Sequence, residues 1–169
     1  MHKGINEPHV LLASSNIERM MRNLKNILDA KSLNKIHLEV RNNVKKLFQL
    51  GEAHYLFAVA ADQSAWRQRV SRFYYGAYNC RRAVMLEFNG HFSTDSSDHK
   101  NINDLPSVLA NSGIYKIKLA NLREDRNLAD YNHEAKPSDL VIPIPDAEQL
   151  VKEFLRDSRL YLDNRGVQV

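Results

Sequence analysis

The chain has 169 residues, of which 43% are hydrophobic and 26% are charged, and its net charge is +4. This composition suits one globular domain and excludes an intrinsically disordered chain. The one cysteine, Cys80, excludes an intramolecular disulfide framework and a cysteine-based zinc knuckle, so we expect a reducing, cytoplasmic compartment. No apolar run approaches the roughly 20 residues that span a bilayer, so we expect no membrane partner.

The first half of the chain predicts three helices, and its few glycines and prolines favour helices over strands. Ser15 is followed three residues later by Glu18, a capping-box pattern that predicts a helix over 16–30. The apolar positions of 34–61 predict a second helix, in which Gly51 is a candidate bend.

The third predicted helix, over 64–89, has the clearest pattern. Its apolar residues recur in steps of three and four, so they lie along one stripe that faces a core. The stripe consists of Trp66, Val70, Phe73, Ala77, Cys80, Val84 and Phe88. Gly90 then ends the helix.

The second half of the chain predicts three further helices separated by loops. These helices cover about residues 101–111, 115–132 and 146–162. Pro106 disturbs the first of them. The segment 136–145 is expected to be extended, because Pro143 and Pro145 exclude a regular helix there. Together these elements predict an all-α fold.

Arginines gather in two stretches of the sequence. The first contains Arg67, Arg69, Arg72, Arg81 and Arg82, and the second contains Arg123 and Arg126. With the positive net charge, these clusters are compatible with a polyanionic partner such as RNA. The alternative is that the first cluster is a solvated helix face.

The stretch NLREDRNLADYNHEAKPSD brings together groups that carry chemistry. Arg126 and His133 are seven residues apart, which on a helix gives their side chains nearly the same direction, about two turns apart. Asp130 lies between them and can reach either one, and Asn127 adds an amide beside the arginine. The alternative is that Arg126 pairs with Asp130 at the surface and His133 merely ends the helix.

The same helix has two sides that favour burial. One stripe contains Tyr115, Leu119, Leu122 and Ala129, and the other contains Ile117, Ala120, Leu128 and Tyr131. Arg126 and His133 point along the first stripe. One side can meet the domain core and the other a second copy of the chain. A buried Arg126 then needs Asp130, Asn127 or a bound phosphate as its partner.

Other familiar catalytic signals are absent from the sequence. It has no glycine-rich phosphate loop, no G-x-S-x-G elbow and no H-E-x-x-H motif. His91, Asp95, Asp98 and His99 gather in one loop and are of metal-ligating types. Polar loops often contain such groups by chance, so we expect no metal site.

Two stretches resemble the HEPN domain family. SRFYYGAYNCRRAVMLEFNG resembles the second core helix of HEPN domains, with a run of small and aromatic residues followed by an Arg-Ala step. REDRNLADYNH resembles the family's R-x4-6-H motif. In it Arg126 is followed by the polar Asn127, and six residues separate Arg126 from His133. The resemblance covers about residues 35–163.

The resemblance implies an antiparallel helical bundle of four to five helices over 35–163, with an N-terminal extension that carries one extra helix over 1–34. Residues 164–169 would form a tail. HEPN domains commonly dimerise, and many are ribonucleases of toxin–antitoxin, CRISPR-linked or phage-defence systems. We therefore expect a homodimer that acts on RNA, with an antitoxin or another defence-system protein as a further partner.

In those ribonucleases the arginine and histidine of the motif line a cleft at the dimer interface and cleave RNA without a metal or other cofactor. The resemblance therefore makes Arg126 and His133 the expected catalytic residues, with Asn127 beside them. The expected supporting residues are Asp130, Tyr131 and Arg123, and the expected RNA-binding residues are Arg72, Arg81 and Arg82.

The sequence departs from the family pattern after the motif. HEPN proteins paired with a nucleotidyltransferase antitoxin often have H-x-Y, whereas Glu134 and Ala135 follow His133 here and the tyrosine, Tyr131, lies inside the motif. This argues against control through modification of such a tyrosine. Two alternatives to a ribonuclease stay open: a non-catalytic HEPN-like adaptor for a protein or nucleotide partner, and an unrelated helical bundle that serves as an interaction module.

Overall fold

The computed structural model describes residues 14–93 and 95–169. Across these ranges the chain forms α-helices and two 3-10 helices, and the only strand-like pairing is one bridge between Asn16 and His91. The elements are α1 (Ile17–Leu24), α2 (Ala30–Ala60), α3 (Trp66–Asn89), η2 (Ser96–Asn101), α4 (Ser112–Tyr131), η3 (Pro137–Asp139) and α5 (Ile144–Asn164). The prediction of an all-α bundle with an extra N-terminal helix is confirmed.

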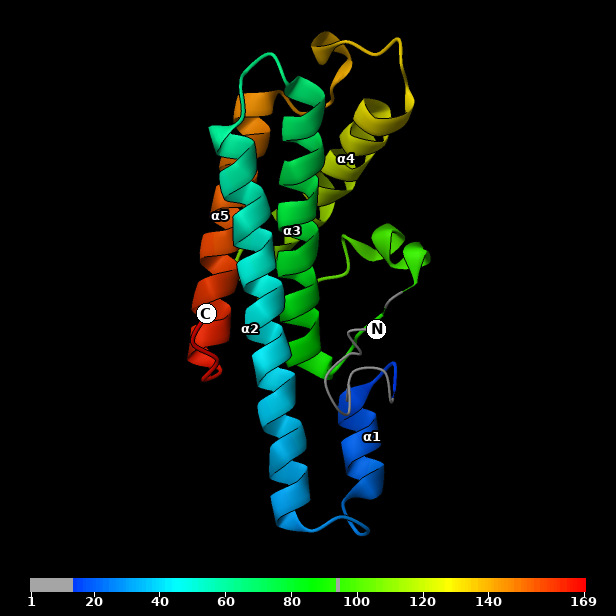
Figure 1. The fold of residues 1–169 in the computed structure, drawn as a ribbon, viewed down its shortest axis with the longest axis vertical. Helices are drawn as coiled ribbons and strands as arrows, with labels where there is room; N and C mark the ends of the chain where they lie inside the picture. The colour runs from blue at the N-terminus through cyan, green and yellow to red at the C-terminus, as the bar shows by residue number, and fades with distance from the viewer. Residues whose placement is uncertain (1–13, 94) are drawn as a thin grey trace, which may run out of the picture.

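The four long helices alternate in direction. In Figure 1, α2 and α4 run upwards and α3 and α5 run downwards, so helices that follow one another in the chain are antiparallel. Helix α3 is central, because it packs against α2, α4 and α5. Helix α1 lies beside the first turns of α2, at the lower end of the bundle. Within the described ranges, no helix combines the length and the apolar character that crossing a membrane requires.

The central position of α3 explains why it is buried on nearly all sides. Most of the predicted stripe is buried, namely Val70, Phe73, Ala77, Cys80 and Val84. Tyr74 and Tyr78 lie off the stripe and are buried as well, while Phe88 is half-exposed near the end of the helix. Burial of each large apolar side chain stabilises the fold by about 1.5–3 kcal/mol, so α3 contributes much of the core.

Gly51 allows α2 and α3 to approach closely. A Cβ atom at Gly51 would lie 2.8 Å from the Gly76 carbonyl oxygen and 3.1 Å from the Cys80 backbone nitrogen. The backbone of α2 remains helical through this position. Gly51 therefore allows the close contact between α2 and α3. The sequence had indicated Gly51 only as a candidate bend.

The N-terminal helices begin and end at different residues from those predicted. The cap of α1 is Asn16, whose Oδ1 accepts from the Arg19 backbone N–H at 2.8 Å, so the Ser15 capping box is wrong. Helix α1 ends at Leu24, well before residue 30. Helix α2 begins at Ala30, four residues before the predicted start, because the Asp29 carboxylate accepts from the Ser32 backbone N–H at 2.7 Å.

Two predictions for the second half of the chain are also wrong. Residues 102–111 form turns and no helix, and the short helix η2 lies before them. Helix α5 begins at Ile144, so Pro145 lies within its first turn. Proline is tolerated there because the first N–H groups of a helix have no intrahelical partner.

Candidate functional site

Arg126 lies near the C-terminal end of α4 and turns its guanidinium towards α3. Its Nη1 donates to Asn127 Oδ1 at 3.0 Å, and its Nη2 donates to the Tyr75 hydroxyl at 2.5 Å. Its Nε lies 2.9 Å from an oxygen of Asp130, and the side chain is only 10% exposed. The sequence offered Asp130, Asn127 or a bound phosphate as the partner of a buried Arg126, and the first two contact it. Tyr75 is a partner that the sequence did not indicate.

Three tyrosine rings surround this guanidinium. The Arg126 Cζ lies 5.2 Å from the ring centroids of Tyr74 and Tyr75 and 5.5 Å from that of Tyr131, all within cation–π range. Burial alone would lower the pKa of Arg126, but the hydrogen bond to Tyr75 and the neighbouring groups raise it. The guanidinium is therefore charged and held in one orientation, which suits it to bind an anionic group.

His133 lies outside the helix that carries Arg126. Helix α4 ends at Tyr131, and Asn132 is extended with φ −100° and ψ 105°. The His133 side chain is 93% exposed in the following turn, with its Nε2 3.9 Å from Glu134. The prediction that His133 continues the stripe of Arg126 is therefore wrong, because the helix stops before the seven-residue repeat is complete.

Arg67 fixes the turn that carries His133. Its guanidinium donates to four backbone carbonyls, those of Ala129, Asn132, His133 and Ala135, at 2.7, 2.7, 3.2 and 2.9 Å. A helix leaves its last carbonyls without intrahelical partners, so Arg67 acts as a cap for α4. The exposed imidazole of His133 therefore lies on a backbone that is held in place.

An open groove adjoins Arg126 and the Arg67 cap. Its volume is about 520 Å³, and it is lined by Phe57, Arg67, Gln68, Ser71, Arg72, Tyr75, Ala129 and Asp130. Two of these residues, Tyr75 and Asp130, are also partners of Arg126, which does not itself line the groove. Its lining contains two arginines and one aspartate, so its formal charge is positive.

The arginines predicted to bind RNA have three different environments. Arg72 is exposed in the groove, and its Nη1 lies 3.1 Å from His54 Nδ1. Arg82 is partly buried and donates to the Ser93 carbonyl at 3.1 Å. Arg81 is 1% exposed and lies 3.1 Å from the Asp98 carboxylate, so the prediction that Arg81 contacts RNA is corrected: it forms an ion pair in the core.

Arg123 and the loop before α4 complete the surroundings of the site. Arg123 is partly buried, donates to the Glu124 carboxylate at 2.5 Å and donates to the Lys100 carbonyl at 3.3 Å. Among residues 14–93 and 95–169, no group of three or more His, Cys, Asp or Glu side chains could hold a metal ion. Asp98, one of the four residues considered as ligands, pairs with Arg81 instead.

The sequence did not predict that His99 would lie close to Arg126. The His99 ring stacks on Tyr78 with centroids 4.2 Å apart, and its Nδ1 lies 2.7 Å from the Tyr74 hydroxyl. One sequence signal was available: Tyr74, Tyr75 and Tyr78 cluster on one helix. Buried tyrosine hydroxyls require polar partners, and the polar loop after α3 supplies one.

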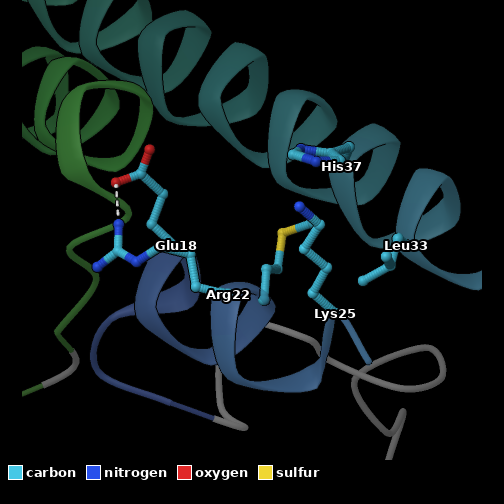
Figure 2. Close-up of a pocket in the computed structure, with 6 residues that line it drawn as sticks. Glu18, Arg22, Lys25, Leu33 and His37 are labelled. Carbon is cyan, nitrogen blue, oxygen red and sulfur yellow. Dashed lines mark ion pairs between the residues drawn. The ribbon is translucent and has the colours of Figure 1, made fainter. Parts of the chain in front are cut away.

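A second hollow lies between α1 and the start of α2 (Figure 2). Its volume is about 330 Å³, and Glu18, Met21, Arg22, Lys25, Leu33 and His37 line it. Glu18 and Arg22 form an exposed ion pair at 3.6 Å on its rim. This hollow contains none of the predicted site residues, so it provides positions for control variants.

The fixed guanidinium of Arg126 and the turn that carries His133 each contact residues that line the groove, although neither Arg126 nor His133 lines it. No family model, no curated protein and no solved structure matches this chain. A function for the site is therefore inferred from the geometry around Arg126.

Proposed function

We propose that this chain is a metal-independent endoribonuclease of the HEPN type that acts as a homodimer. The observation that carries the proposal is the Arg126 guanidinium, which Tyr75, Asn127 and Asp130 hold beside an open groove. Each terminal nitrogen of Arg126 donates one hydrogen bond within the described residues and carries a second N–H. These donors can bind the oxygens of a phosphodiester.

The reaction requires little beyond the groups that the site contains. RNA supplies its own nucleophile, the 2′-hydroxyl, and cleavage needs a base for that proton, an acid for the leaving 5′-oxygen and a cation near the phosphate. Imidazole exchanges protons near neutral pH, so His133 suits either proton-transfer role. The expected products are a 2′,3′-cyclic phosphate, or its hydrolysed form, and a 5′-hydroxyl.

A homodimer would bring two copies of His133 and Arg126 into one cleft. Two residues of the predicted second apolar side of α4 face outwards in the single chain, where Ile117 is 68% and Tyr131 is 74% exposed. Tyr131 also lies against the Arg126 guanidinium. A second copy that covered this side would therefore lie next to the site and could deliver its own His133.

A specific observation favours a second candidate, a non-catalytic HEPN-like adaptor. Within one chain, the nearly buried Arg126 and the exposed His133 do not share a common stripe. The groove beside Arg126 would then bind a protein or nucleotide partner without cleaving it. Only the ribonuclease requires His133, so a His133 variant separates the two functions.

The deciding experiment compares His133→Ala and Arg126→Ala with the wild type on a defined RNA in the presence of a chelator. We expect each change to slow cleavage by at least about 10²-fold, the effect of a positioned acid, base or phosphate-binding group. The measurement is the single-turnover cleavage rate, with the product ends identified by enzymatic end-labelling.

The matched control is His37→Ala, which removes an exposed imidazole from the hollow in Figure 2, away from the site. This variant should cleave as the wild type does. Cleavage by His133→Ala at the wild-type rate, with the fold intact by circular dichroism, would exclude the catalytic role of His133. Absence of cleavage by the wild type itself would leave the adaptor.

A further inference from the structure

His99 is a second imidazole in the tyrosine cluster that surrounds Arg126. It belongs to η2, and its Nδ1 lies 2.7 Å from the Tyr74 hydroxyl. The Arg126 Cζ lies 5.2 Å from the centroid of the same Tyr74 ring. Tyr75 contacts both groups as well, with its ring 5.9 Å from His99 and 5.2 Å from the Arg126 Cζ. Two adjacent tyrosines therefore connect the imidazole to the guanidinium.

The contact with Tyr74 defines which nitrogen of His99 is available. Nδ1 is engaged by the Tyr74 hydroxyl, and no group in residues 14–93 and 95–169 hydrogen bonds Nε2. The stacking on Tyr78 fixes the plane of the ring, and the side chain remains partly exposed. The proposed role uses the tautomer in which Nδ1–H donates to the Tyr74 oxygen, because Nε2 then carries a free lone pair that can accept a proton.

The surroundings also favour the neutral form of His99. Burial lowers the pKa of His99 below its ordinary value of 6.5, and the charges of Arg126 and Arg82 lower it further, while Asp98 acts in the opposite direction. A neutral imidazole at pH 7 is the form that a general base requires. The titratable and charged groups that face His99 are Tyr74, Tyr75, Tyr78 and Arg82 from α3, Arg126 from α4, and Asp98 from its own helix.

We propose that His99 is the general base of the cleavage reaction, acting on RNA whose phosphate is bound by Arg126. Its Nε2 accepts the proton of the 2′-hydroxyl as the 2′-oxygen bonds to phosphorus. The bond between phosphorus and the 5′-oxygen breaks, and a protonated His133 donates a proton to the leaving oxygen. This role rests on the proposed ribonuclease function, and it gives each chain its own base beside its own arginine.

The test is His99→Asn, which keeps a polar atom close to the position of Nδ1 and removes Nε2. We expect the single-turnover cleavage rate to fall about 10²- to 10⁴-fold. Binding is measured with an RNA that has a 2′-deoxy residue at the cleavage position, and its dissociation constant should stay within about twofold of the wild-type value. The wild-type rate should rise with pH through the His99 pKa, below 6.5, and fall again at higher pH as the general acid loses its proton. The variant should lose this acidic limb.

The matched control is His37→Asn, which should retain both the rate and its pH profile. If the wild type cleaves and His99→Asn cleaves equally fast with the same pH profile, the role of His99 is wrong and the ribonuclease function stands. If the wild type does not cleave RNA, both proposals are wrong.

An NMR titration of the wild type tests His99 without any change to its packing. Addition of the 2′-deoxy RNA should shift the His99 ring resonances. In the proposed complex, the 2′-carbon of the nucleotide at the cleavage position lies next to Nε2 of His99. Resonances of His99 that stay unchanged when the RNA saturates the protein would overturn the proposal, even if His99→Asn fails to fold.

Discussion

Arg81 and Arg126 are both nearly buried arginines, and their partners give them different roles. Arg81 is 1% exposed and faces the 2% exposed carboxylate of Asp98 at 3.1 Å. Arg126 instead lies among tyrosine rings beside a groove and shares a partly exposed carboxylate, that of Asp130. A guanidinium whose charge is matched inside the core stabilises the fold, whereas one that is fixed at the edge of a groove can bind an anion. The role of each arginine therefore depends on its partners and on whether an anion can reach its guanidinium.

At this scale we predict that Asp98→Asn destabilises the protein by about 3–5 kcal/mol, because it leaves the Arg81 charge buried without its counter-charge. Urea denaturation at pH 7 measures the change in the free energy of unfolding. Asp104→Asn is the control, since Asp104 is 65% exposed at 3.7 Å from the same guanidinium and should cost less than about 1 kcal/mol. Equal losses for the two variants would contradict the prediction.

The stabilising effect of the Asp98 carboxylate depends on pH in a definite direction. Burial would raise the pKa of Asp98, but Arg81 and the hydrogen bonds to the carboxylate hold it below its ordinary value of 3.8. The stabilising contribution of Asp98 is therefore complete well above pH 3.8 and is lost as the pH falls through the folded-state pKa. The difference between the wild type and Asp98→Asn should accordingly narrow below pH 3.8.

At the scale of the element, the contact between α2 and α3 determines how the site is assembled. Helix α3 provides Tyr74, Tyr75 and the Arg67 cap, while α2 forms one wall of the groove through Phe57. The two helices approach closely at Gly51. The width of the groove therefore depends on a contact between backbones at a distance from the site.

We predict that Gly51→Ala destabilises the protein by about 1–2 kcal/mol. Its Cβ would lie 2.8 Å from a backbone oxygen of α3, and the strain of separating the helices exceeds the gain in helix propensity of about 1 kcal/mol. Gly113→Ala is the matched control, because Gly113 lies in α4 with nothing within 4 Å of its added Cβ. Denaturant unfolding should show Gly113→Ala to be neutral or stabilising, and a similar result for Gly51→Ala would contradict the close contact.

At the scale of the whole molecule, the site borders a surface that a single chain leaves uncovered. Ile114, Ile117 and Tyr131 are all more than half exposed along α4, and Tyr131 also contacts Arg126. Exposed apolar residues that gather on one helix often belong to an interface between proteins. This is the surface on which the proposed homodimer would form.

We predict that Ile117→Glu weakens dimerisation at least tenfold, equivalent to about 1.4 kcal/mol, and lowers cleavage at a fixed protein concentration in parallel. The charge would be buried in the interface without a partner. Leu160→Glu is the control, since Leu160 is 56% exposed on α5. Sedimentation equilibrium measures the dimer, and an unchanged dissociation constant for Ile117→Glu would exclude α4 as the interface.

Much of the fold was predictable from the sequence, because it depends on local patterns. The stripe of α3 and the apolar sides of α4 follow from helical periodicity, and the contact of Arg126 with Asp130 follows from their i,i+4 spacing on one helix. Helix ends were predicted less well. The start of α2 at the Asp29 cap and the end of α4 at Tyr131 each depend on one or two residues. Because α4 ends at Tyr131, His133 lies outside the helix.

The sequence by itself determined the all-α bundle and the local partners of Arg126, since both arise from residues a few positions apart. Only the tertiary structure decided that Arg81 is buried with Asp98, that Arg67 caps α4 and that His99 meets Tyr74. Each of these contacts joins segments that lie 17 to 68 residues apart in the chain. Such pairings depend on how the helices pack, because a side chain's position along the sequence does not specify which distant group it will meet.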